Sequence, residues 1–206
     1  MNQTLGEFNW QQTALLLVDL QVDFLDPAGA YGRAGQIADS IAALPGRIRP
    51  LAAALKQNGG LVVASRFTLW PDGRGDPMIS PHLKTLRPFL GRGDFAPDSD
   101  GQAVVEPLRA LVDLSVDKVA YSAFFNTQLD WVLRRAGIEN LIFSGIVTQG
   151  GVASSVRDAH VRDYNPIVLS DGCATFRQAT HDIAIQDMAS IASIATCDQL
   201  ARSLKL

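Results

Sequence analysis

Short apolar runs alternate along the chain with longer stretches that have helical periodicity. Five runs are mostly apolar, at residues 14–18, 61–64, 141–143, 166–169 and 191–195, and a sixth, which begins with a lysine, covers 118–121. A run that is apolar on both faces is typical of a strand in the interior of a parallel sheet. These runs therefore predict six strands.

Helical stretches lie between the predicted strands. Residues 37–55 place apolar side chains on one stripe, and Pro45 and Pro50 predict that this helix is kinked or divided in two. Further helices are expected at residues 127–136, 152–161 and 180–188. Strands alternating with helices form right-handed βαβ units. We therefore predict a single α/β domain, residues 1–206, with a doubly wound parallel β-sheet flanked by helices.

One long segment, residues 68–102, has no clear period and is rich in proline and glycine. Irregular segments of this length inside a compact domain are typically active-site lids, binding loops or disordered. Trp70, Phe89 and Phe95 give this one apolar anchors. We therefore expect an ordered lid or a contact between subunits.

Composition narrows the possible partners. Hydrophobic residues make up 47% of the chain and charged residues 19%, and the net charge is −3. Lys and Arg are scattered, which disfavours a nucleic acid or a membrane surface as partner. The first residues lack the basic and apolar regions of a signal peptide, and no apolar run is long enough for a transmembrane helix. We therefore expect a cytoplasmic protein with Cys173 and Cys197 reduced, and a small-molecule substrate.

In an open parallel sheet, the ligand site lies beyond the carboxyl ends of the strands. At these ends the chain carries Asp19, Gln21, Arg66, Phe67, Lys118 and residues 145–151. The G-x-G-x-x-G of dinucleotide folds, the P-loop, the D-x-D of aspartyl phosphatases and the G-x-S-x-G nucleophile elbow are all absent from these positions. The sequence thus excludes several common doubly wound families.

Asp19 and Lys118 are the two charged groups at these strand ends that are suited to catalysis. A carboxylate at a buried strand end, held by a lysine, is suited to proton transfer. A structural ion pair that closes the top of the sheet is the alternative. The sequence alone leaves both interpretations open.

Residues 145–151 run from a buried strand into a helix through Gly150 and Gly151. Glycines there let the backbone approach a ligand, and the N–H groups at a helix start attract anions. A plain turn that needs glycine for tight packing is an equally good explanation.

Taken in order, four segments resemble the isochorismatase-like superfamily, also called cysteine hydrolases. They are the opening strand at 14–25, the segment 118–127 with its Tyr-Ser-Ala-Phe-Phe, the loop and helix at 145–159, and Ser-Asp-Gly-Cys-Ala at 170–174. The resemblance covers nearly the whole chain. It implies a Rossmann-like sheet and a hydrolase of small metabolites, and family members generally form homo-oligomers, so we expect one here.

The resemblance also implies roles for individual residues. Asp19 and Lys118 match the catalytic acid and lysine of the family. A cis peptide bond is implied between Ile146 and Val147, with the amides of Val147 and Gly151 as oxyanion donors and Gly150 in the same loop.

The chain departs from the amidohydrolase members at Gly151, where they carry the nucleophilic cysteine. Without that thiol, amide hydrolysis through a thioester is not expected. Isochorismatases also lack the cysteine and cleave a vinyl ether by protonation from the aspartate. They carry Gln at the position of Phe67, however, so the substrate stays open.

Eight side chains near these positions are expected to contact the substrate. They are Gln21, Phe24, Arg66, Phe67, Trp70, Tyr121, Phe124 and Gln149. We expect no cofactor and no metal, because nicotinamidases carry Asp-x-His after the second strand and the first histidine here is His82.

The sequence therefore predicts a hydrolase that uses Asp19 and Lys118 for acid–base catalysis, with Gly151 in place of a nucleophile. The bond cleaved would be a vinyl ether or a related C–O or C–N bond. Two alternatives remain: an inactive homologue that binds a small molecule, and a cysteine amidohydrolase whose nucleophile has been replaced at Gly151.

Overall fold

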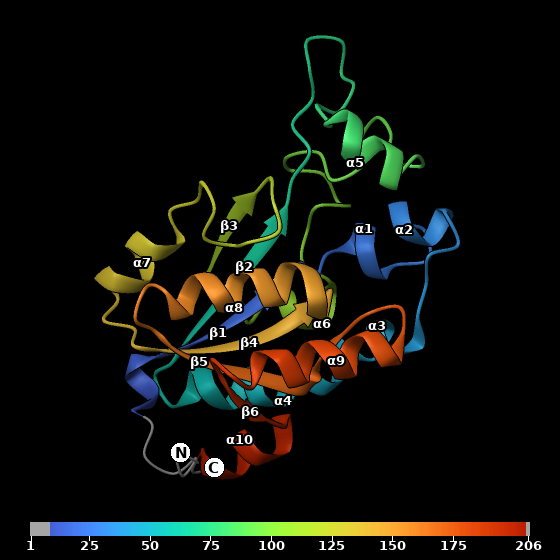
Figure 1. Ribbon diagram of the computed structural model, residues 1–206. Helices are drawn as coiled ribbons and strands as arrows, with labels where there is room; N and C mark the ends of the chain where they lie inside the picture. Colours follow the sequence, from blue (N-terminus) through green and yellow to red (C-terminus); the bar gives the residue numbers. More distant parts are fainter. Residues whose placement is uncertain (1–8, 205–206) are drawn as a thin grey trace.

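The computed structural model describes residues 9–204 and contains one parallel sheet of six strands. The strands are β1 (Thr13–Val18), β2 (Leu61–Phe67), β3 (Leu114–Lys118), β4 (Asn140–Ile146), β5 (Asn165–Ala174) and β6 (Ser193–Ala195). Their order is β3-β2-β1-β4-β5-β6, and every neighbouring pair is parallel (Figure 1). The predicted doubly wound sheet is confirmed.

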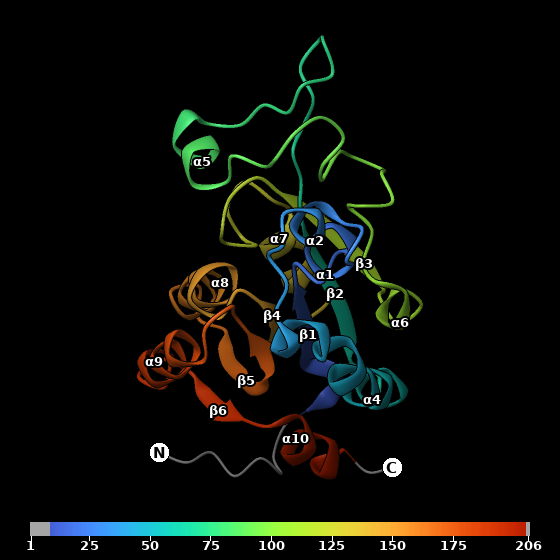
Figure 2. The ribbon, with the colours of Figure 1, turned by 90° about the vertical axis from the view of Figure 1, so that its right-hand side faces the viewer.

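Helices cover both faces of this sheet, as Figure 2 shows. On one face lie α4 (Leu44–Gln57), α6 (Glu106–Arg109) and α10 (Cys197–Ser203), and on the other lie α7 (Leu129–Arg135), α8 (Ala153–His160) and α9 (Gln178–Met188). Strand β1 contributes to both cores, because Leu15 and Leu17 face α4 whereas Leu16 faces α8. Because both faces of β1 are buried, its sequence is apolar without interruption.

The helix that was predicted at residues 37–55 is divided in two, as its prolines suggested. It forms α3 (Asp39–Ala42) and α4, with Pro45 in the first turn of α4. Proline is tolerated there because the first N–H groups of a helix have no partner within it. Short helices α1 (Val22–Leu25) and α2 (Ala30–Arg33) precede this pair.

The predicted third strand at 118–121 was wrong in position. The strand is Leu114–Lys118, so Lys118 is its last residue and residues 119–121 lie beyond it. Strand β3 is at the edge of the sheet, and three of its five residues are partly or fully exposed. An edge strand need not be apolar on both faces, so it lacks the continuous run that marks the inner strands.

Segment 68–102 is ordered around a small aromatic core of its own. It contains α5 (Pro81–Leu86), and its Leu90 and Phe95 pack with Ala30 and Tyr31 of α2. The buried carboxylate of Asp23 accepts hydrogen bonds from the amides of Ala30 (2.9 Å) and Phe95 (2.7 Å). These contacts hold the segment beyond the carboxyl ends of the strands, next to α2 (Figures 1 and 2).

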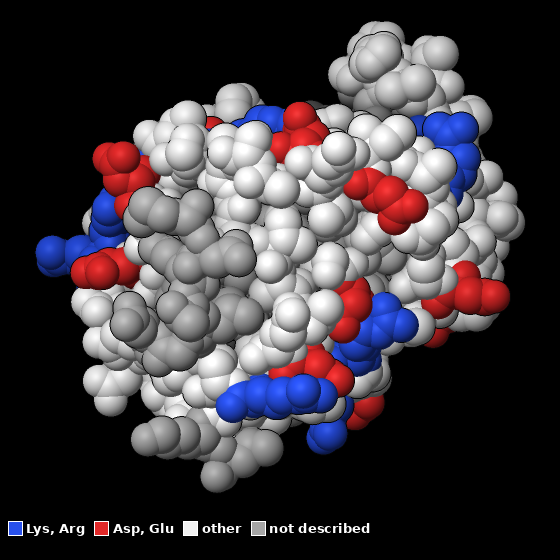
Figure 3. All heavy atoms as spheres, turned by 60° about the horizontal axis from the view of Figure 1, so that its bottom comes forward, with Lys and Arg blue, Asp and Glu red and all other residues white. Residues whose placement is uncertain are grey.

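The surface carries both signs of charge. On the face in Figure 3, acidic and basic side chains lie next to one another. Within the part of the chain that the structure describes, no helix has the length and apolar character to cross a membrane.

Candidate active site

A cavity of about 200 Å³ lies at the carboxyl ends of the central strands. Its wall includes Asp19 after β1, Phe67 at the end of β2, Lys118 at the end of β3 and Ile146 at the end of β4. These strands are neighbours or near neighbours around the point where the chain crosses from β3 to β4. The parallel topology thus gathers residues that are more than a hundred positions apart in the sequence.

Asp19 and Lys118 form a buried ion pair in this wall. Lys118 Nζ lies 2.7 Å from Asp19 Oδ2, and the two residues are 2% and 6% exposed, respectively. The same ammonium donates to the carbonyl of Ala120 at 2.9 Å, and Ser65 Oγ donates to Asp19 Oδ1 at 3.2 Å. Asp19 has φ of 56°, so its backbone turns sharply at the end of β1. The two groups therefore have fixed positions and little contact with water.

The burial of Asp19 changes its acidity. Removal of the carboxylate from water raises its pKa above the usual range, and this effect exceeds the opposing attraction and hydrogen bond of Lys118. A carboxyl group with a raised pKa holds a proton at a higher pH and can act as a general acid.

Between β4 and α8 the chain makes a tight loop past this pair. The Ile146–Val147 peptide bond is cis, at the position that the resemblance implies. Gly145 has φ of 120°, and a Cβ there would lie 2.1 Å from the carbonyl oxygen of Val18. Only glycine fits at this position, so β4 can approach β1 closely where the loop begins.

Gly151 lies beside the carboxylate of Asp19. A Cβ at Gly151 would be 3.2 Å from Asp19 Oδ2 and 2.9 Å from the carbonyl oxygen of Ile146. A side chain at this position would thus extend next to the acid. Ser155, one turn later, is already engaged: its hydroxyl donates to the carbonyl of Gly151 (2.7 Å) and accepts from the amide of Ala123 (2.9 Å).

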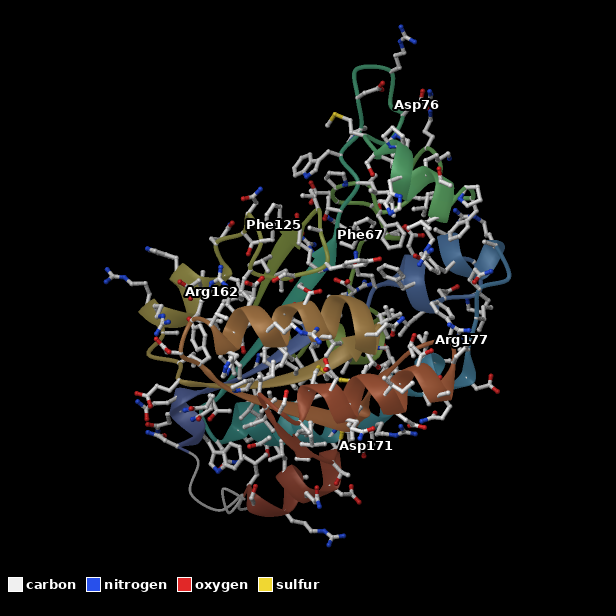
Figure 4. The ribbon with its side chains drawn as sticks, in the orientation of Figure 1. Phe67, Asp76, Phe125, Arg162, Asp171 and Arg177 are labelled. Carbon is white, nitrogen blue, oxygen red and sulfur yellow. The ribbon has the colours of Figure 1, made fainter. Side chains whose placement is uncertain are left out.

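Four of the eight expected substrate contacts line the cavity. They are Phe24, Phe67, Tyr121 and Gln149, and the loop residues Val147, Gly150 and Gly151 lie in the same wall. Figure 4 shows Phe67 at the end of β2, on the side of α1 and α2.

Gln21 and Arg66 lie outside the cavity wall, which corrects their expected role. Gln21 is fully buried, and its amide group bonds to both the N–H and the carbonyl of Phe67 and to the carbonyl of Gln102. Arg66 pairs with Asp117 on the neighbouring edge strand at 2.8 Å. Side chains in β2 alternate between the two faces of the sheet, so Phe67 and Arg66 point in different directions.

Trp70 and Phe124 also lie outside the wall. Trp70 is 49% exposed and is absent from the cavity lining; it precedes the tip of the segment at Asp76, which Figure 4 labels. Phe124 is buried in the core with α7 and α8, where its ring contacts Tyr164 and the guanidinium of Arg162. The sequence offered no distinction between these rings and the ones that reach the site.

A further group of residues, which the sequence did not indicate, completes the wall. These are Tyr31 from α2, Leu83, Arg87 and Leu90 from segment 68–102, and Phe176 after β5. Tyr31, Leu83, Arg87 and Leu90 come from segments outside the strand ends, so the topological rule does not reach them, and the aromatic anchors of segment 68–102 were the only available signal. Phe176 lies two residues after β5, where the rule applies.

Within residues 9–204, no cluster of three or more His, Cys, Asp and Glu side chains has the arrangement of a metal site. His181 instead pairs with Thr148, whose Oγ1 lies 2.9 Å from the imidazole Nδ1 in a buried position. This contact ties the loop after the cis bond to α9.

Residues 13–199 match the family model "Isochorismatase domain". The chain belongs to the isochorismatase family. Its sequence is 34% identical to the ureidoacrylate amidohydrolase RutB of Pantoea ananatis (strain LMG 20103) over 179 residues, which are 80% of this chain and 70% of that protein.

Solved structures of the isochorismatase family share the fold. A cysteine hydrolase from Pseudomonas syringae pv. phaseolicola 1448A has a TM-score of 0.80 at 25% identity, covering 99% of this chain and 98% of the other. An N-carbamoylsarcosine amidase from Thermoplasma acidophilum has a TM-score of 0.71 at 25% identity, covering 91% and 97%. The family and its hydrolase class are thus as the sequence predicted.

Proposed function

We propose that this isochorismatase-family chain is a hydrolase that cleaves a small metabolite by acid–base catalysis, without a cysteine nucleophile. The observation that carries the proposal is the 2.7 Å contact between Asp19 and Lys118 in the cavity wall, next to Gly151. Buried acid–base pairs in a cavity are typical of catalytic sites. The cavity of about 200 Å³ is smaller than the roughly 300–1,000 Å³ of sites for drug-sized ligands, which supports a small substrate.

The proposed reaction begins with proton transfer from the Asp19 carboxyl group to the terminal carbon of a vinyl ether. The oxocarbenium ion that results takes up a water molecule, whose released proton returns to Asp19. The hemiketal then breaks its C–O bond to give a ketone and an alcohol. This sequence needs an acid, a water molecule and charge stabilisation, and no covalent intermediate on the protein.

Lys118 and the glycine loop have separate roles in this proposal. Lys118 keeps Asp19 in place and stabilises the carboxylate that forms when the proton leaves. The amides of Val147 and Gly151 are proposed to hold the leaving-group oxygen, which gains negative charge as the C–O bond of the hemiketal breaks. This role is supported by the position of both residues in the cavity wall that contains Asp19.

A panel of vinyl ether, ester, amide and imide substrates tests this function on the wild type, Asp19→Asn and Gly151→Cys. We expect hydrolysis of one C–O or C–N substrate by the wild type, and a loss of about 100-fold or more in kcat/KM for Asp19→Asn because the proton donor is gone. Hydrolysis that survives this substitution would refute the assigned role of Asp19.

The same panel separates the alternatives. If the wild type hydrolyses nothing while Gly151→Cys gains amidase activity, the chain is an amidohydrolase that lacks its nucleophile. If neither protein is active and a small molecule still binds, it is a binding protein. A Cβ at Gly151 would lie 2.9 Å from the backbone oxygen of Ile146, closer than normal contacts, so the backbone of the loop must shift in Gly151→Cys.

A further inference from the structure

The cavity contains a second polar group that no part of the proposed chemistry uses. Arg87 follows α5 directly, and its Nε donates to the hydroxyl of Tyr31 on α2 at 3.0 Å. Both residues line the same cavity as Asp19 and Lys118. They belong to α2 and to the segment beyond the strand ends, so they form a different part of the wall from the acid–base pair (Figure 1).

Charge distinguishes Arg87 from the arginines around it. Arg33 is paired with Asp94, and Arg92 is paired with Asp76 at 3.0 Å. Among residues 9–204, Arg87 has no carboxylate partner. While Asp19 is ionised it neutralises Lys118, so the charge in the cavity wall that has no counter-charge is that of Arg87. Protonation of Asp19 leaves Lys118 as a second positive charge.

The guanidinium has donors left for a ligand. Its Nε and Nη1 donate to Tyr31 and to the carbonyl of Leu86, and within the described part of the chain no acceptor pairs with Nη2. Arginine prefers planar anions with two oxygens, which it binds through parallel hydrogen bonds. Because Tyr31 accepts from Arg87, its own O–H can point toward a second acceptor. Burial raises the pKa of Tyr31, so the phenol stays protonated as a donor.

The surfaces between these polar groups are flat and apolar. The rings of Phe24, Phe67 and Phe176 line the cavity, and Phe176 stacks on Tyr31 with an angle of 8° between the planes. Aromatic walls of this kind favour planar or unsaturated ligands, which contact the rings over their whole face.

We propose that Tyr31 and Arg87 are specificity-determining residues that select small, flat substrates with a carboxylate group. The carboxylate binds Arg87 and Tyr31, the flat body lies among the aromatic rings, and the reacting bond lies near Asp19. Only this last placement rests on the proposed function. Recognition of the carboxylate is a binding property and can be measured without turnover.

The test compares benzoate with benzamide, two flat molecules that differ mainly in charge, by isothermal titration calorimetry on the full chain. The variants are Arg87→Gln, Tyr31→Phe and the control Arg92→Gln, which removes an exposed arginine of the same segment that lies outside the cavity wall. Thermal unfolding of each variant checks that the fold is retained.

We expect the wild type and Arg92→Gln to bind benzoate at least about tenfold more tightly than benzamide, as a charge-assisted pair predicts. Arg87→Gln should remove this preference, and Tyr31→Phe should weaken benzoate binding severalfold. The proposal is overturned if benzamide binds the wild type as well as benzoate, if neither compound binds, or if Arg87→Gln keeps the preference.

Asp19→Asn separates this proposal from the catalytic one. We expect it to keep the preference for benzoate, because Arg87 is unchanged. Hydrolysis that persists in Asp19→Asn would overturn the catalytic proposal alone. Loss of the benzoate preference in Arg87→Gln supports the specificity proposal, and hydrolysis that depends on Asp19 supports the catalytic one.

Discussion

Two opposing effects determine the pKa of the Asp19 carboxyl group. Burial raises the pKa of the carboxyl group and the nearby ammonium of Lys118 lowers it, and burial has the larger effect. Under the proposed mechanism only the protonated carboxyl group starts the reaction. The rate should therefore fall as the pH rises through this raised pKa.

Lys118→Met tests the balance between these two interactions. Removal of the ammonium leaves desolvation unopposed, so the pKa of Asp19 rises further. We expect the falling limb of kcat/KM to move to higher pH, beside an overall lower rate because charge stabilisation is lost. A pH–rate profile of the wild type and the variant measures both effects.

Lys56→Met serves as the matched control. Lys56 pairs with Asp113 at the other end of the sheet and is not part of the cavity wall. Its pH profile should match that of the wild type. An unmoved limb in Lys118→Met would show that Asp19 is not the group that controls the rate.

Among the larger elements, segment 68–102 depends on a small aromatic core. Phe95 is fully buried, and its ring lies 4.5 Å from that of Phe24 and 5.2 Å from that of Phe67, measured between centroids. The same cluster holds Leu90 and Tyr31, which line the cavity. The wall of the site thus depends on packing that is separate from the two main cores.

Phe95→Ala should loosen this segment. Truncation of a buried phenylalanine costs about 3–5 kcal/mol, and here the loss falls on the cluster that joins the segment to α2. We expect a lower Tm and faster amide hydrogen exchange across residues 68–102, with less change in the sheet. Phe125→Ala is the control, because Phe125 is 53% exposed and its removal should cost little. Uniform exchange throughout the chain would contradict a separate core.

In the whole molecule, the sheet and its covering helices keep both thiols away from water. Cys173 and Cys197 are buried and unpaired. Burial raises the pKa of Cys173, and it raises the pKa of Cys197 to about 12. A thiol reacts through its thiolate, so neither cysteine is suited to nucleophilic chemistry in the folded state.

Thiol labelling with Ellman's reagent checks this interpretation. We expect native protein to react roughly a thousandfold more slowly than protein unfolded in guanidinium, because both access and thiolate are lacking. Dithiothreitol should leave the Tm unchanged. Rapid labelling of native protein would mean that the fold opens readily around β5 or α10.

The expected homo-oligomer and the absence of nucleic acid or membrane partners stay predictions.

The local pattern of the chain was sufficient for most of the sheet and for part of the site. Two-sided burial produces continuous apolar runs, and parallel strands bring their carboxyl ends to one edge, so Asp19 and the loop at Gly151 were predictable as neighbours. The pattern put Lys118 at the start of the third strand, so its pairing with Asp19 followed from the family resemblance and from the structure. The departure at Gly151 was also visible, since it is a matter of residue identity.

The direction of individual side chains and the far wall of the site required the tertiary structure. Arg66 and Phe67 are adjacent in the sequence, yet only Phe67 lines the cavity, because the pleat of β2 turns them apart. Tyr31 and Arg87 meet through contacts that have no period in the sequence. The strands and their alternation with helices follow from patterns repeated along the chain, whereas the fit of irregular segments depends on packing between distant residues.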